Sequence, residues 1–84
     1  MKYILILLLA LPNLVNAQEK AKEFYESKRL KSITTTVDGK PEGVFQEWYE
    51  NGSKKAEGNF DGGERHGKWQ EWYENGKLWS LAFF

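Results

Sequence analysis

The chain has 84 residues, enough for one small domain, and its 12 basic and 12 acidic side chains balance to a formal charge of zero. Such a chain lacks the basic surface that nucleic acid or anionic lipid requires, so no nucleic-acid partner is expected. It contains no cysteine, so no disulfide supports the fold and no thiol can carry a lipid. A core this small supplies about 3–5 kcal/mol, and we expect marginal stability or a stabilising partner.

Residues 1–17 have the layout of a secretory signal peptide. Lys2 gives a basic start, residues 3–11 form an apolar run, and the small residues at 15–17 suit a cleavage site. The run is shorter than the ~20 residues that span a bilayer, which argues against a membrane anchor. We expect a helical signal peptide, cleavage before Gln18, and an exported protein, periplasmic or extracellular, with no stable membrane insertion. Cleavage removes Lys2 and no acid, leaving 11 basic against 12 acidic side chains and a charge of −1.

One ten-residue stretch occurs twice, 24 residues apart. GVFQEWYENG at 43–52 returns as GKWQEWYENG at 67–76, and the same offset aligns a worn earlier copy that begins near Tyr25. A period of this size indicates stacked supersecondary units. The predicted organisation is a signal peptide at 1–17, a polar lead-in at 18–28, and about two and a half repeats at 29–42, 43–66 and 67–84.

Each repeat has the composition of a β-hairpin. The β-favouring runs VFQEWY and KWQEWY stop at Asn51-Gly52 and Asn75-Gly76, and Asn-Gly is typical of a type I′ turn with positive φ at both residues. Polar, glycine-rich loops that close at Gly43 and Gly67 are expected between hairpins. The polar segment 18–28 leaves two interpretations open, a frayed lead-in or one to two helical turns. The predicted fold is all-β, an elongated meander sheet in which stacked hairpins bury an apolar face together.

The returning strands carry small residues at matching positions. Strict alternation places residues 54, 56, 58 and 60 on one face. The small residues on this face of the three returning strands are Ser32, Thr34, Ala56, Gly58, Ser80 and Ala82. They leave room for aromatic side chains from neighbouring strands, and the candidates are Phe45, Trp48, Trp69 and Trp72.

The pattern G-x-[FW]-x-E-W-Y-E-N-G, followed by a lysine-bearing strand and D-G-x-x-x-x-G, resembles the bacterial variant of the MORN repeat, including the YwqK-type antitoxins. The resemblance covers residues 43–84 well and 25–42 weakly. It implies an extended β-hairpin sheet that serves as an interaction scaffold and, for some members, a toxin-neutralising or lipid-associated role. The export signal argues against a cytoplasmic toxin as partner, and the near-neutral charge argues against anionic lipid.

The last repeat departs from this pattern in its returning strand. Trp79, Leu81 and Phe83 replace a lysine, a glutamate and an asparagine of the preceding repeat, so a polar face is expected to become apolar. Terminal repeats normally carry a polar outer face. Two explanations are open: the strand is a docking surface, or the gene is truncated or frame-altered near its end.

The residue pattern predicts no enzyme, no cofactor and no metal site. Glu47 and Glu71 occupy equivalent repeat positions, whereas acid/base catalysis requires carboxyl groups in unlike environments. His66 is the single histidine, expected on an exposed loop, and a zinc site would lack nitrogen and sulfur ligands. The segment DGGE at 61–64 lacks both calcium-loop spacing and the lysine of a phosphate loop.

The aromatic pairs Trp48-Tyr49 and Trp72-Tyr73 are candidates for binding. Neighbours in a strand point to opposite faces, so one member of each pair faces away from the core unless both faces are covered. These aromatics form either the sheet core or platforms that stack on a sugar or peptide. The candidate partner-binding residues are Trp48, Tyr49, Trp72, Tyr73, Trp79, Leu81 and Phe83.

The expected function is that of a non-catalytic exported scaffold. It would bind another protein through its aromatic face or through an open sheet edge at residues 78–84, where self-association is also an option. The alternatives are an envelope carbohydrate binder that stacks sugars on Trp48 and Trp72, an antitoxin-like partner of a toxin, and a gene remnant without a selected function.

Overall fold

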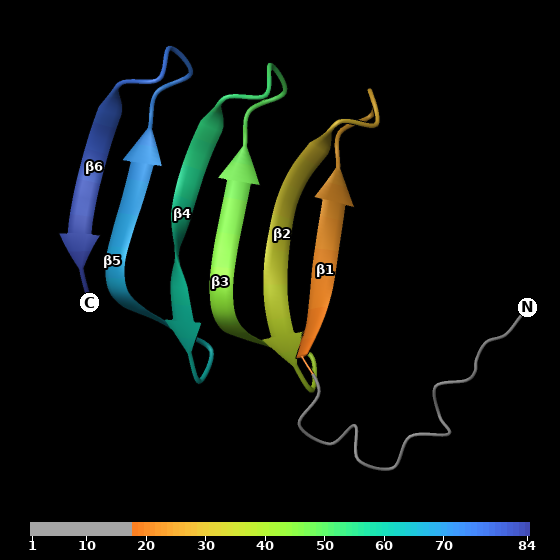
Figure 1. The fold of residues 1–84 in the computed structure, drawn as a ribbon, viewed down its shortest axis with the longest axis vertical. Helices are drawn as coiled ribbons and strands as arrows, with labels where there is room; N and C mark the ends of the chain where they lie inside the picture. Colours follow the sequence, from red (N-terminus) through yellow and green to blue (C-terminus); the bar gives the residue numbers. More distant parts are fainter. Residues whose placement is uncertain (1–17) are drawn as a thin grey trace, which may run out of the picture.

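The structure, a computed structural model, describes residues 18–84, so the predicted signal peptide lies outside the described residues. Six strands form one antiparallel sheet in chain order, which agrees with the predicted all-β meander (Figure 1). The strands are β1 Gln18–Phe24, β2 Leu30–Val37, β3 Lys40–Trp48, β4 Lys54–Asp61, β5 Glu64–Trp72 and β6 Leu78–Phe83. Within this range no helix has the length and apolar character needed to cross a membrane.

The polar segment at 18–28 begins with a strand, so neither a frayed lead-in nor a helical turn is correct for residues 18–24. β1 pairs with β2 from Gln18 opposite Val37 to Phe24 opposite Leu30. The 24-residue offset makes β1 the equivalent of β3 and β5, so the sheet contains three hairpins. The sequence did not indicate a strand here, because every residue of β1 is exposed and its composition is as polar as that of a loop. Edge strands commonly carry such charged side chains.

The loops at Asn51-Gly52 and Asn75-Gly76 are not the predicted type I′ turns. In the first, the Gly52 N–H donates to the Tyr49 carbonyl (2.9 Å), and of Asn51 and Gly52 only the glycine has a positive φ, 93°. This is the hairpin loop in which a turn is followed by one left-handed residue. Asn51 contributes through its side chain, whose Oδ1 accepts the Ser53 N–H at 2.9 Å. Lys28, with φ 76°, holds the left-handed position in the first hairpin.

Type I′ geometry occurs instead between the hairpins. Both residues have positive φ in Asp38-Gly39 (55° and 80°) and in Gly62-Gly63 (63° and 89°). The strands are paired up to the residues on either side of each turn. The predicted loops are therefore two-residue turns between long strands. His66 is exposed as expected, but it lies on β5 rather than on a loop.

Each hairpin has a β-bulge beside its longer loop. Glu47 pairs with Ala56 and Trp48 with Lys54, so Lys55 is left without a partner on β3. Opposite residues of an antiparallel pair share a face, so Lys54 lies on the face of Trp48, while Ala56 lies on the face of Glu47. The prediction that residues 54–60 alternate without interruption is therefore wrong at Lys54. The same bulge recurs in the first and last hairpins.

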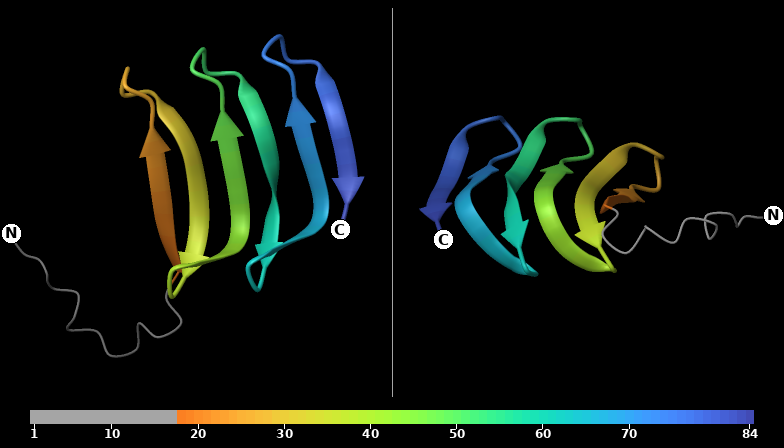
Figure 2. Two further views of the ribbon diagram at one scale, coloured as in Figure 1. Left: turned by 180° about the vertical axis from the view of Figure 1, so that it is seen from behind. Right: turned by 60° about the horizontal axis from the view of Figure 1, so that its bottom comes forward.

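Gly43 and Gly67 do not close loops but lie inside β3 and β5. The register with the preceding strand shifts at both, and their φ values are 104° and 71°. Positive φ at a bulge bends a strand. The strands are accordingly curved, and the sheet forms one bowed layer (Figure 2) with extents of 45 × 33 × 10 Å.

The core is a small aromatic cluster on one face of this layer. Trp69 is only 6% exposed; it stacks on Phe45 with ring centroids 5.6 Å apart and meets Phe60 edge-on at 5.1 Å. Gly58 lies beneath Trp69, and a Cβ atom at that position would overlap the indole ring. A small residue therefore makes room for an aromatic one, as predicted for Trp69. We call the face that carries this cluster the core face.

Replacing Gly58 with alanine is expected to lower the free energy of unfolding by about 1–3 kcal/mol, because the new methyl group must displace Trp69 from its packing. Thermal unfolding followed by circular dichroism measures the change. Ala82 holds the equivalent position in the last hairpin, so Ala82→Gly is the matched control and should have a smaller effect. An unchanged Tm in Gly58→Ala would show that Trp69 does not pack over β4.

Candidate functional site

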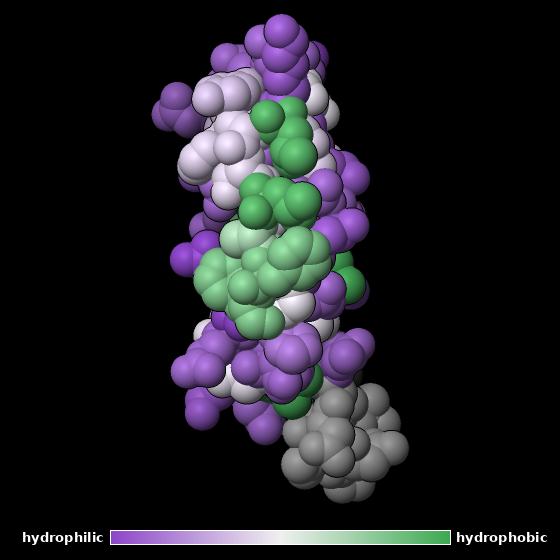
Figure 3. Space-filling model, turned by 90° about the vertical axis from the view of Figure 1, so that its left-hand side faces the viewer, coloured by the Kyte–Doolittle hydropathy of each residue, from purple (hydrophilic) through white to green (hydrophobic). Residues whose placement is uncertain are grey.

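Exposed apolar side chains gather on the edge strand β6 and the residue that follows it. Their exposed fractions are 46% for Leu78, 53% for Trp79, 50% for Leu81, 73% for Phe83 and 55% for Phe84. Figure 3 looks onto this side of the molecule and shows hydrophobic residues running along it. We call the surface formed by these five residues the β6 edge.

The apolar side chains of the β6 edge lie on both faces of the sheet. Leu81 is opposite Gln70 on the face away from the core. Trp79 is the bulge residue of this hairpin and packs against Tyr73, with ring centroids 6.2 Å apart. The expectation that Trp79, Leu81 and Phe83 share one face is therefore wrong, because the bulge interrupts the alternation at Trp79.

The backbone of β6 is open toward solvent on its outer side, since no other strand of residues 18–84 pairs there. Phe84 and Gly67 exchange both of their backbone hydrogen bonds, at 3.0 and 3.1 Å. Hydrogen-bonded and non-hydrogen-bonded pairs alternate along an antiparallel ladder. Leu81 and Phe83 therefore direct their N–H and C=O groups away from β5, toward the open side.

The opposite edge of the sheet is chemically different. β1 carries Glu19, Lys20, Lys22 and Glu23, and all of its residues are exposed. Charged side chains on an edge strand oppose unspecific pairing with other strands. Residues 78–84 contain no charged side chain. The sheet therefore has one edge that is protected by charge and one that is not.

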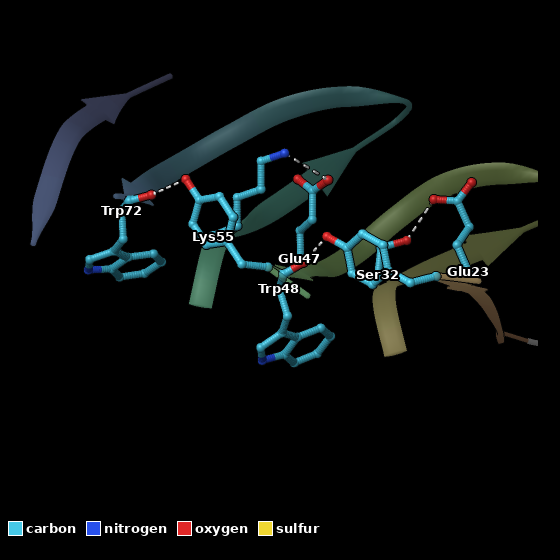
Figure 4. Close-up of polar contacts among 8 residues, drawn as sticks. Glu23, Ser32, Glu47, Trp48, Lys55 and Trp72 are labelled. Carbon is cyan, nitrogen blue, oxygen red and sulfur yellow. Dashed lines mark hydrogen bonds and ion pairs between the residues drawn. The ribbon is translucent and has the colours of Figure 1, made fainter. Parts of the chain in front are cut away.

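Tyrosine hydroxyl groups tie neighbouring hairpins together next to the longer loops (Figure 4). The Tyr25 hydroxyl donates to the Trp48 carbonyl at 2.7 Å, and the Tyr49 hydroxyl donates to the Trp72 carbonyl at the same distance. Tyr73 is the third member of this row and is 55% exposed. Among residues 18–84 no protein atom accepts a hydrogen bond from its hydroxyl, because no further hairpin lies beyond it in the sheet.

The bulge residue of each hairpin covers the tyrosine of that hairpin. The Lys31 ammonium lies 5.7 Å from the Tyr25 ring centroid, and the Lys55 ammonium lies 5.5 Å from that of Tyr49. Lys55 also approaches the Glu47 carboxylate at 3.9 Å (Figure 4). Trp79 takes the place of lysine in the last hairpin. In the last hairpin, an exposed indole at position 79 therefore lies against the tyrosine, where the other two hairpins place a lysine ammonium.

Trp48 and Trp72 point to the face opposite Glu47 and Lys55 (Figure 4). Together with Arg29, Leu30, Tyr49 and Gly52, Trp48 lines a hollow of about 310 Å³. The Lys54 ammonium lies 5.8 Å from the Trp72 ring centroid. The two tryptophans thus lie apart from the core cluster, which is built from other aromatics, and the prediction that Gly58 and its equivalents make room for them is wrong.

Glu47 and Glu71, for which no catalytic role was expected, lie on one face of the sheet on either side of Ala56, which is opposite both of them. Glu47 is opposite Ala56 and Glu71 is opposite Ser80, which are equivalent places in successive hairpins. Within the described range no three metal-ligating side chains lie close enough to hold an ion. Sequence reasoning missed Tyr25, Leu78 and Phe84. The 24-residue offset did align Tyr25 with the other two tyrosines, but it did not show which atom their hydroxyl groups bind.

Three similar hairpins that repeat across one bowed layer, with successive hairpins tied by the same hydroxyl-to-carbonyl bond, define a tandem β-hairpin repeat protein. The model of the MORN repeat variant family matches residues 41–61 and 65–84, which form the second and third hairpins. The chain is a MORN-repeat protein. Neither the curated proteins nor the solved structures contain a match to it. The first hairpin lies outside the two matches, yet it makes the same bond through Tyr25.

Tyr49→Phe is expected to lower the free energy of unfolding by about 1 kcal/mol, the net value of one hydrogen bond, and the Tm by about 4–8 °C. Tyr73→Phe removes the same oxygen from an exposed ring whose hydroxyl has no partner within the described residues, so its Tm should match that of the parent protein. Differential scanning calorimetry on both variants provides the comparison. Equal losses would contradict the assigned role of the Tyr49 hydroxyl.

Proposed function

We propose that this MORN-repeat protein is a non-catalytic interaction module that binds another protein by strand addition at the β6 edge. The observation that carries the proposal is the coincidence, at Leu81 and Phe83, of outward backbone groups with exposed apolar side chains. In strand addition the main-chain hydrogen bonds give affinity, and the side chains give specificity. Apolar groups on both sides of the edge add hydrophobic burial when a strand docks.

The contrast between the two edges favours a dedicated partner. An apolar open edge is an aggregation liability in an isolated domain, whereas β1 carries charges that reduce this risk. A partner that covers β6 removes the liability. The signal-like residues 1–17 favour an exported chain, so the proposed partner is a periplasmic, cell-envelope or extracellular protein. An exported toxin is one such partner, in keeping with the family resemblance.

Phe83→Glu is expected to reduce partner capture at least about tenfold, because a carboxylate next to the added strand would have to be desolvated. The measurement is affinity purification from the envelope and culture fractions, with quantitative mass spectrometry of the retained proteins. Val44→Glu is the matched control, since Val44 is 44% exposed but lies on the interior strand β3. Equal retention by the two folded variants would contradict binding at the β6 edge.

The hollow beside Trp48 favours a second candidate function, the binding of an envelope carbohydrate. An indole face next to Arg29 offers both a stacking surface and a hydrogen-bond donor, the combination that suits a sugar ring. The neighbouring Trp72 lies two strands away, or about 10 Å at the usual strand spacing. A chain of sugars would reach both rings.

A sugar that stacks on Trp48 should shift tryptophan fluorescence on titration with envelope polysaccharide, and Trp48→Ala should abolish the shift. Trp79→Ala is the control, because Trp79 is also exposed but lies away from the hollow. A flat titration of the parent protein would eliminate the carbohydrate function.

A further inference from the structure

We propose that the strand seated on the β6 edge is β1 of a second copy of this chain, so that the sheet continues head to tail. This inference rests on the proposed function, because it requires that the β6 edge accept a strand. By the 24-residue repeat, β6 is equivalent to β2 and β4. In the sheet, each of those two strands is followed by a repeat equivalent of β1: β3 pairs with β2, and β5 pairs with β4. Docking of a second β1 continues an interface that the sheet already contains twice.

The tyrosine row identifies the first contact of this interface. Each hydrogen bond between hairpins joins a tyrosine hydroxyl to the carbonyl 23 residues further along, from Tyr25 to Trp48 and from Tyr49 to Trp72. Translation by one more repeat leads from Tyr73 to the residue equivalent to Trp48 in the next hairpin. In a second copy that residue is Phe24, at the end of β1. The Tyr73 hydroxyl therefore donates to the Phe24 carbonyl of the second copy.

A second contact follows the same translation along the longer loops. Arg29 Nη1 donates to the Glu50 carbonyl at 3.4 Å, and Ser53 Oγ donates to the Glu74 carbonyl at 3.0 Å, each spanning 21 residues. Lys77 holds the equivalent position in the last hairpin. Its ammonium group is a donor and reaches toward the Glu26 carbonyl of the second copy.

The register of the existing interfaces fixes the register of the new one. Ser32 is opposite Glu47 across the first, and Ala56 is opposite Glu71 across the second. The third pair is Ser80 with Glu23 of the second copy. Ser80 directs its backbone groups toward β5, as the ladder through Phe84 and Gly67 requires, so the new pair is non-hydrogen-bonded, with Cα atoms about 4.5 Å apart.

The contact has a defined extent. Leu81 is opposite Lys22 of the second copy, whose aliphatic stem can lie along apolar surface while its ammonium stays in water.

β1 carries Glu19 where β3 and β5 carry the bulge residues Gly43 and Gly67. Pairing is therefore confined to the half of β1 next to its loop. Contacts of this head-to-tail type are not self-limiting, so the species formed is a concentration-dependent series rather than a fixed dimer.

Cysteine cross-linking in the full chain tests the register, because the sequence contains no cysteine. Glu23→Cys and Ser80→Cys are prepared as separate variants, mixed, and oxidised with a glutathione buffer. The expected Cα separation lies within the 4.4–6.8 Å that disulfides span, so a mixed disulfide dimer should form. Lys22→Cys mixed with Ser80→Cys is the matched control, since Lys22 points to the other face, and its yield should be at least about tenfold lower.

Tyr73→Phe in the Ser80→Cys chain is the second variant. The lost hydroxyl should lower the yield of mixed disulfide about 2- to 10-fold, the equivalent of one net hydrogen bond. The Tm of the monomer should be unchanged. An unchanged yield would overturn the contact between Tyr73 and Phe24 of the second copy.

Three other outcomes would overturn the head-to-tail arrangement. Equal yields from the Glu23 and Lys22 variants would indicate random collision. A dominant self-disulfide in Ala82→Cys would show that two β6 edges pair with each other, which leaves strand addition at β6 intact. A monomeric mass by light scattering, together with no mixed disulfide, would exclude a second copy as the bound strand. The proposed function would then be decided separately, by comparing partner capture by Phe83→Glu and by Val44→Glu.

Discussion

A sheet of one layer has no opposing layer against which to bury its side chains, and the rest of this structure depends on that constraint. Apolar burial has to come from side chains that lie flat along the sheet. Trp69 lies flat over Gly58, stacks on the Phe45 ring and meets the Phe60 ring edge-on. Its indole N–H donates to the Asn59 carbonyl at 2.9 Å, so the buried polar atom is satisfied. Only a row of hairpins provides enough neighbours for this arrangement.

The same constraint accounts for the tyrosine bonds. Neighbouring hairpins share only one strand-to-strand ladder, and a hydroxyl that reaches the next carbonyl adds a link outside that ladder. Each link depends on a loop of fixed shape, because the loop sets where the tyrosine ring leaves the sheet. The left-handed residue of that loop is Lys28 in the first hairpin and Gly52 in the second. The tyrosine that opens such a loop thus takes part in an interaction between repeats as well as in a turn within one.

The period and the β-favouring runs were sufficient to predict an all-β meander of hairpins. The details that failed have a common cause, since strict alternation and turn statistics describe regular strands. The bulges at Lys55 and Trp79 break the alternation, and nothing local in the sequence marks them. Asn-Gly satisfies two loop types, one through the φ angles of both residues and one through the asparagine side chain. β1 has the polarity of a loop because an exposed edge strand needs no apolar face.

For the candidate site, the sequence identified the unusual residues but not their arrangement. Trp79, Leu81 and Phe83 were recognisable because they break the repeat. Their division between two faces, and the outward direction of the backbone at Leu81 and Phe83, follow only from the register with β5.

Lys28 shows how unevenly the three hairpins are optimised. It holds with φ 76° the left-handed conformation that glycine holds in the other two longer loops, and such a conformation costs a residue with a side chain about 1–2 kcal/mol. This cost falls on the hairpin that contains the fully exposed strand β1. In a domain this small, a cost of that size is a large fraction of the stability expected for the whole fold. The bond from the Tyr25 hydroxyl to the Trp48 carbonyl, which ties the first hairpin to the second, offsets part of it.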